Sequence, residues 1–253
     1  MDASEHQSYP NPTIQEAICE IVFAMPENET WNPIWFGEFF KHIQNDYTSF
    51  EPVNMTSIQF QIGFGNQEAP QAPPPSQIVR YRHPSRPSVL QLSDRSLAVY
   101  CHPVYPGWDV MLKDIEYGIE KLKAVVNPEK VIRIGLRYIN RIERSVPGET
   151  LSKWLVSNDY VPKIILNSLP GFISFVQSRL DENNRLNVTV GEQIVKPSQP
   201  AFIFDIDRIL EKELPLESEI LLPEMTLLHE NVWDVFKSAK TEELERMLNG
   251  ELL

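Results

Sequence analysis

Hydrophobic residues along the chain follow two different spacings. In several short segments apolar and polar residues alternate between turn residues, and this spacing of two predicts β-strands. The predicted strands are residues 13–23, 55–64, 77–83, 88–93, 96–102, 131–142, 171–180, 185–195 and 200–209. Other segments repeat apolar residues every three or four positions, which predicts amphipathic helices. The predicted helices are residues 31–47, 106–126, 149–157 and 223–248.

The predicted elements occur in the same order twice. Residues 12–127 and residues 130–250 each read strand, helix, three or more strands and a final helix. Strand-rich runs closed by a long helix are typical of an antiparallel sheet with helices on one face. We therefore predict an α+β fold in which two repeats of this pattern pack as one compact unit. The repeats can join edge to edge in a saddle-shaped sheet, with their opening strands side by side at the centre, or each can curl around its own helix.

One predicted strand carries arginines at a strict spacing. In residues 131–142, Arg133, Arg137 and Arg141 share one face, with Gly135 between the first two. The other face is almost entirely apolar, and we expect it to contact the helices. That face holds Ile132, Ile134, Leu136, Tyr138, Asn140 and Ile142.

Two other predicted strands present carboxylates in the same period. They are Glu16 and Glu20 in the first strand, and Asp205 and Asp207 in the segment FIFDID. One interpretation is a structural ladder of cross-strand ion pairs, because a half-buried arginine needs a counter-charge. The other is a concave site for a phosphate, a carboxylate or an acidic peptide, in which Gly135 leaves room for the ligand. We expect at least two of the arginines to contact these carboxylates.

Few residues indicate catalysis. Asp205 and Asp207 are the best candidates, because carboxylates on one strand face can act as a hydrolytic pair or hold a divalent cation. Neighbouring Arg137 and Arg141 are expected to keep both ionised, which favours ion pairing. His102 could act as a base, although a strand-end position beside Pro103 explains it better. The histidines lack the spacing of metal ligands and the chain lacks nucleotide-binding glycine motifs, so we predict no metal or cofactor.

The charge of the chain is uneven. The net charge is −12, and the acidic residues concentrate in 1–50 and 205–253, leaving residues 51–204 mildly basic. A general nucleic-acid binder needs a continuous basic footprint, so this class is excluded. An acidic surface suits a basic protein partner. The oligomeric state, including a dimer, stays open.

Cys19 and Cys101 each lie inside a predicted strand without a neighbouring metal ligand, which predicts two buried free thiols. No segment has the length of apolar residues that a transmembrane helix needs, and the acidic start is unlike a signal peptide. We therefore expect a soluble cytoplasmic protein. The segment 65–77 is rich in proline, which predicts an exposed loop or, alternatively, a polyproline ligand.

Four motifs suggest a family. The segments NPTIQEAICEIVF, GLRYINRI, FIFDID and LLHENVWDVFKSAKTEELERML follow one another in this order. Together they resemble a sporadically distributed family of uncharacterised bacterial proteins of about this length. The resemblance implies that His229 and Phe236 occupy motif positions and that Thr241 caps the last helical turn, whereas Lys237 stands where the family has an acidic residue. The patchy distribution is typical of mobile or defence-linked genes.

These observations favour a non-enzymatic binding or interaction protein, such as an accessory, immunity or antitoxin-like component. The alternative is an enzyme or sensor that binds an anionic small molecule in a cavity between sheet and helices. Tryptophans at core positions of their helices could line such a cavity or simply fill the core. They are Trp31, Trp35, Trp108, Trp154 and Trp233.

Overall fold

The structure is a computed structural model that describes residues 9–53, 77–144, 146, 148–168, 171–193 and 200–251. Its strands are β1 (Ile14–Ala24), β2 (Glu51–Val53), β3 (Ile78–Arg82), β4 (Ser88–Ser93), β5 (Ser96–Cys101), β6 (Lys130–Glu143), β7 (Ile173–Arg179), β8 (Asn184–Gln193) and β9 (Ala201–Leu210). Its helices are α1 (Ile34–Ile43), α2 (Trp108–Lys123), α3 (Ser218–Ala239) and α4 (Glu242–Leu248), and short 3₁₀ turns cover Leu151–Lys153 and Lys163–Ile165.

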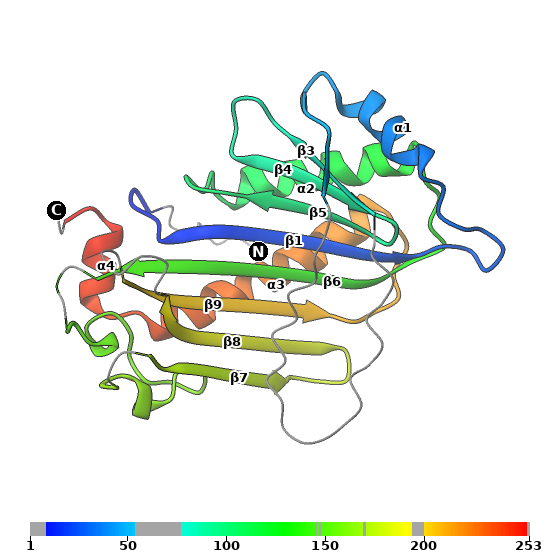
Figure 1. The fold of residues 1–253 in the computed structure, drawn as a ribbon. Coiled ribbons are helices and arrows are strands. Elements are labelled where there is room, and N and C mark those ends of the chain that lie inside the picture. Colours follow the sequence, from blue (N-terminus) through cyan, green and yellow to red (C-terminus); the bar gives the residue numbers. More distant parts are fainter. Residues whose placement is uncertain are drawn as a thin grey trace.

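The strands of the described residues form one nine-stranded sheet in the order β2-β3-β4-β5-β1-β6-β9-β8-β7 (Figure 1). Every neighbouring pair is antiparallel. The predicted α+β fold with an antiparallel sheet is therefore confirmed. The opening strands of the two predicted repeats, β1 and β6, lie side by side at the centre, as in the edge-to-edge arrangement. Whether the two parts of the chain are repeats stays a prediction.

The long helices cover one face of the sheet (Figure 1). Helix α2 packs on β4 and β5, helix α3 packs on β6 and β9, and the two helices contact each other. The apolar stripe of α2 explains this contact, because Met111, Ile115, Ile119 and Leu122 recur at helical spacing and are fully buried. The core therefore lies between the helices and the sheet.

Two glycines fix the position of α2. Gly107 precedes the helix with a φ of 95°, a conformation that side chains rarely adopt, and it lets the chain turn into the helix. Gly118 faces the sheet, where an added Cβ would lie 3.2 Å from a methyl carbon of Leu97. The missing side chain therefore lets α2 approach β5 closely.

The central strand departs from strict alternation at one end. The pairing of β1 with β6 shifts register between Val22 and Phe23, and opposite this shift Val131 is fully buried while Ile132 is 39% exposed. The expectation that Ile132 faces the helices is therefore wrong. A bulge adds one residue to a strand and reverses the faces beyond it, which the spacing of hydrophobic residues did not reveal.

The helix predicted for residues 223–248 is wrong in its extent, because the chain there forms α3 and α4 with a break at Lys240. The segment 149–157 forms only a 3₁₀ turn instead of a helix. Both differences have one cause, since Leu155 and Lys240 form a β-bridge that holds both backbones extended. Thr241 then caps α4, with its Oγ1 accepting a hydrogen bond from the Leu244 amide at 3.1 Å.

Two predicted segments cannot be compared with the structure. The strand predicted for 55–64 and the proline-rich loop up to residue 76 lie outside the described residues. Strand β2, a three-residue edge strand, was not predicted.

Cys19 and Cys101 are buried free thiols, as predicted, and burial raises the pKa of both. None of the helices in the described ranges combines the length and hydropathy that a membrane span needs.

Candidate functional site: the ladder face

We call the sheet surface opposite α2 and α3 the ladder face, after its charged residues Glu20, Arg133, Arg137, Asp205 and Asp207. These side chains project from β1, β6 and β9, three neighbouring strands of the sheet. The reverse side of β6 meets the core, since its aromatic and aliphatic residues between the arginines are buried, as predicted. The alternation of polar and apolar residues along β6 therefore places its arginines on the ladder face.

Arg137 and Asp205 form an ion pair with two hydrogen bonds on the ladder face. The Arg137 Nε donates to Asp205 Oδ1 at 2.9 Å, and Nη2 donates to Oδ2 at 2.6 Å. The pair is diagonal, because Arg137 lies opposite Asp207 in the register while Asp205 lies opposite Ile139. The Asp205 side chain is 10% exposed and that of Arg137 is 45% exposed. The guanidinium thus covers a nearly buried carboxylate and keeps one side in contact with solvent.

Arg133 and Glu20 form the second predicted ion pair. Glu20 lies opposite Gly135 in the register of β1 and β6. A Cβ built on Gly135 would meet Arg133 Nη1 at 3.7 Å. The space above Gly135 is therefore used by the Arg133 guanidinium on its way to Glu20, and the room that we expected for a ligand is taken by the protein itself.

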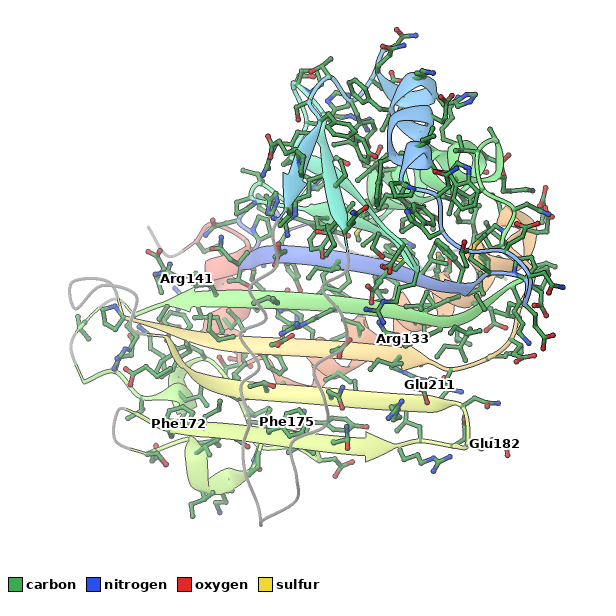
Figure 2. The ribbon with its side chains drawn as sticks, turned by 45° about the vertical axis from the view of Figure 1, so that its right-hand side comes forward. Arg133, Arg141, Phe172, Phe175, Glu182 and Glu211 are labelled. Atoms are coloured by element: carbon green, nitrogen blue, oxygen red, sulfur yellow. The ribbon has the colours of Figure 1, made fainter. Side chains whose placement is uncertain are left out.

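Arg141 contacts a carboxylate that the sequence did not single out. It forms an ion pair with Glu143, two residues further along β6, and not with Glu16 or Asp205. Figure 2 shows Arg133 and Arg141 toward opposite ends of β6. The prediction that at least two of the three arginines contact the named carboxylates is confirmed by Arg133 and Arg137.

Asp205 and Asp207 lie on the same face but in different surroundings. Asp207 accepts a hydrogen bond from Asn187 Nδ2 at 3.2 Å. Burial raises the pKa of Asp207, and this effect outweighs the opposing influence of Asn187 and Arg137. The expectation that neighbouring arginines determine its ionisation is therefore incomplete. Asp205 is engaged by Arg137 on both oxygens, so the two carboxylates do not form a shared acid–base pair.

The outer edge of the ladder face is apolar, which the sequence analysis missed. Ile173 and Phe175 on β7 are 70% and 53% exposed. Phe175 lies opposite Thr189 of β8, which lies opposite Asp205 of β9, so all three share the ladder face. Figure 2 shows Phe175 on the outermost strand. The alternation of β7 places Ile173 and Phe175 on one face, but Val176 on the other face is also apolar, so the sequence did not show which face is exposed.

Alternate residues of β7 also leave their backbone hydrogen-bonding groups directed away from β8. Phe172 O accepts from the Glu192 amide and the Leu180 amide donates to Asn184 O, so even-numbered positions bond with β8. The backbone N–H and C=O groups of Ile173 and Phe175 therefore point away from β8, as those of alternate residues in an edge strand do. This edge can accept another strand.

The remaining candidates are structural. All five tryptophans belong to the hydrophobic core or pack against it, so the core interpretation is confirmed. Trp108 stacks on His229 with ring centroids 4.3 Å apart. His102 Nδ1 lies 3.6 Å from a Glu16 oxygen, beyond hydrogen-bond distance. Within the part of the chain that the structure describes, no group of three or more His, Cys, Asp or Glu side chains could hold a metal ion.

One buried ion pair was also missed. Arg144 follows β6 and pairs with Glu192 of β8, with side chains 7% and 1% exposed, and its guanidinium lies over the ring of Phe202. No motif links these residues, because the contact depends on how the strand ends meet.

No family model matches the sequence, and no curated protein matches it either. The family resemblance of the four motifs therefore stays a prediction.

Proposed function

We propose that this protein is a non-enzymatic binding protein, an accessory, immunity or antitoxin-like component that holds a protein partner on its ladder face. The observation that supports this most directly is the exposure of Ile173 and Phe175 on β7, the edge strand of the sheet that the described residues form. Exposed apolar side chains on an edge strand favour association with another chain, and native proteins usually cover or charge such edges.

The surroundings of this edge favour a specific partner. The partner's backbone can hydrogen-bond with β7, while apolar side chains cover Ile173 and Phe175. Further in, Arg137 offers the solvent-exposed side of its guanidinium to a polar group of the partner. The net charge of −12 speeds the approach of a basic protein.

The alternative, an anionic small molecule, has less support. Arg133 and Arg137 already contact carboxylates, so an incoming anion would compete with Glu20 or Asp205. Displacing Asp205 would leave a nearly buried carboxylate without its counter-charge. The paired arginines therefore fit a structural role on the ladder face, and the apolar edge formed by Ile173 and Phe175 is the part that binds the partner.

The proposal can be tested by capture from the native host with the neighbouring genes expressed. We expect the wild-type protein to retain a stoichiometric partner and the double variant Ile173→Ser, Phe175→Ser to lose it, because the variant removes the apolar contacts and keeps the core. Ile164→Ser is the matched control, since Ile164 is 82% exposed in a different segment. Retention by the double variant, or no partner for the wild type, would contradict the proposal.

A further inference from the structure

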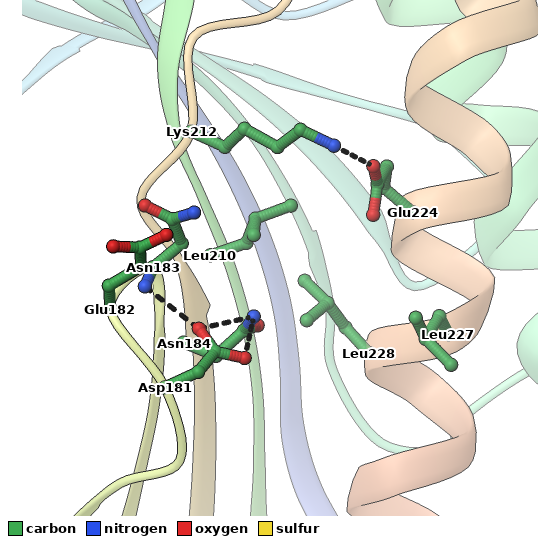
Figure 3. Close-up of a pocket in the computed structure, with 9 residues that line it drawn as sticks. All are labelled: Asp181, Glu182, Asn183, Asn184, Leu210, Lys212, Glu224, Leu227 and Leu228. Carbon is green, nitrogen blue, oxygen red and sulfur yellow. Dashed lines mark hydrogen bonds and ion pairs between the residues drawn. The ribbon is translucent and has the colours of Figure 1, made fainter.

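A second surface feature lies apart from the ladder face, at the end of the sheet where the β7–β8 turn approaches α3. It is a pocket of about 310 Å³, which we call the hairpin pocket (Figure 3). Its walls come from the turn, from the end of β9 with the segment after it, and from α3. The lining residues are Asp181, Glu182, Asn183, Asn184, Leu210, Lys212, Glu224, Leu227 and Leu228.

One wall of the hairpin pocket is apolar. Leu210 and Leu228 are 4% and 2% exposed and belong to the core, whereas Leu227 is 52% exposed. Figure 3 shows Leu227 and Leu228 on α3, across from the turn. A leucine that is half exposed beside two buried ones offers apolar surface that an alkyl chain would cover.

The opposite wall, formed by the turn, carries Asp181 and Glu182, and a third carboxylate, Glu224, lies on α3 near the leucines. The lining contains three carboxylates and one ammonium group, which leaves a net charge of two negative. Asp181 accepts hydrogen bonds from the Asn183 amide at 2.8 Å and from Asn184 Nδ2 at 2.8 and 3.0 Å. These bonds, the Asn183 amide first, lower the pKa of Asp181, so its carboxylate is ionised at neutral pH. A carboxylate can accept about four hydrogen bonds, so Asp181 retains room for a further donor.

A buried arginine lies behind this wall. Arg208 is 5% exposed and donates to Asn184 Oδ1 at 2.9 Å, and the same amide donates to Asp181. Its positive charge reduces the negative potential of the pocket but also holds Asp181 in the ionised state. Arg185, near the turn, is neutralised by an ion pair with Glu211.

The mouth of the pocket already contains a cation on an alkyl stem. Lys212 Nζ lies 2.9 Å from Glu224 Oε1, and the Lys212 side chain is 46% exposed (Figure 3). Exposed pairs of this kind contribute little to stability, so Lys212 can leave Glu224 without disturbing the fold. The pair shows the chemistry that this pocket accepts, namely an ammonium group against a carboxylate.

We propose that the hairpin pocket binds an ammonium or guanidinium group carried on an alkyl stem. The stem lies against Leu227 and Leu228, and the cation replaces Lys212 at Glu224 and contacts Asp181. Either a free alkylamine or a lysine or arginine side chain of a protein can supply this group. The proposal does not depend on the function proposed for the ladder face, because the two surfaces share no residue.

The test is a titration followed by backbone amide NMR signals. The probes are n-butylammonium and n-butylguanidinium, with neutral n-pentanol as the matched control. A second arm compares the blocked tripeptide acetyl-Gly-Lys-Gly-amide with its Nε-acetylated form. We expect both cations and the lysine peptide to shift signals of residues 181–184 and 224–228, with affinities that weaken as salt increases.

Variants locate the binding. Glu224→Gln removes one carboxylate and leaves Lys212 in the pocket, so it should weaken n-butylammonium binding by about tenfold or more. Leu227→Ser should weaken it less, through the lost apolar contact. Glu230→Gln, on the same helix but outside the lining, should change nothing.

The outcomes separate clearly. Tighter binding of the lysine peptide than of n-butylammonium would identify a protein side chain as the occupant, and the reverse would identify a free amine. Equal shifts with n-pentanol and n-butylammonium, no shifts at all, or the same loss of binding in Glu230→Gln and Glu224→Gln would overturn the proposal.

Discussion

Both faces of the sheet hold arginines, and Arg137 and Arg208, one from each face, contact different kinds of acceptor. Arg137 and Arg208 are close in the sheet, since Arg208 lies opposite Leu136, the residue next to Arg137. On the ladder face, half-exposed Arg137 contacts the carboxylate of Asp205. On the helix face, buried Arg208 contacts only neutral oxygens among the hydrogen bonds of the described residues.

The difference shows how burial changes the contacts that an arginine needs. Arg208 donates to the side chains of Asn184 and Asn231 and to the backbone oxygens of Arg185 and Ile209, at 2.9–3.2 Å. Burial lowers the pKa of Arg208, and the nearby Asp181 charge opposes this effect. Hydrogen bonds to four neutral oxygens therefore take the place of a direct ion pair, as a buried polar group requires.

The largest effect is expected for Arg208→Ala. The substitution leaves a cavity and four oxygens without their donor, so it should reduce the free energy of unfolding by about 3–5 kcal/mol. Urea unfolding measures this, with Arg246→Ala as a control because Arg246 is 52% exposed. A loss for Arg208→Ala as small as that of the control would mean that the helix face does not depend on this arginine.

Arg137→Met should have a smaller effect. The guanidinium is partly exposed, but its removal orphans the nearly buried Asp205, so we expect a loss of about 1–2 kcal/mol. Asp205→Asn in the same background should recover part of it, because the uncompensated charge is gone. A double-mutant cycle measures the coupling, and additive effects of the two substitutions would show that the pair does not act as a unit.

Glu20→Gln tests whether burial of the carboxylate determines the strength of the ladder pairs. The Glu20 side chain is 32% exposed and its partner Arg133 is 33% exposed, so solvent screens this pair more than it screens Asp205. We expect a loss of about 0.2–1 kcal/mol in urea unfolding. If Glu20→Gln costs more than Asp205→Asn, burial is not the deciding factor.

The same comparison shows what the sequence could predict. The alternation of β6 and β9 assigned Arg137 and Asp205 to one face, and by the same period Arg208 follows Phe202, Phe204 and Ile206 onto the helix face. The spacing of two thus predicts the face of a side chain. It does not predict the diagonal contact to Asp205, because the register of β6 and β9 depends on the folded sheet.

The remaining differences arise from contacts between distant segments. The break between α3 and α4 follows from the backbone bridge of Leu155 with Lys240, and no local pattern marks it. The bulge beside Ile132 and the buried pair of Arg144 with Glu192 likewise depend on how strands meet. The hairpin pocket joins the turn at residues 181–184 to residues 224–228 of α3, so it could be recognised only in the folded chain.

The smallest effect, and the only stabilising one, is expected for Asp207→Asn. Burial raises the folded-state pKa of Asp207 above its unfolded value of 3.8, so the ionised carboxylate costs stability at neutral pH. This cost is absent below the unfolded pKa and grows as pH rises through the folded pKa. Asparagine removes the charge, and its side-chain oxygen can still accept from Asn187.

The melting temperature of Asp207→Asn should therefore exceed that of the wild type at pH 7, and the difference should shrink toward zero as the pH falls below 4. Asp181→Asn should behave in the opposite way, because hydrogen bonds lower the pKa of Asp181 and make its ionised form stabilising. Thermal unfolding of both variants across this pH range measures the contrast. A pH-independent difference for Asp207→Asn would show that the hydrogen bond with Asn187, and not desolvation of the carboxylate, determines the stability of this part of the ladder face.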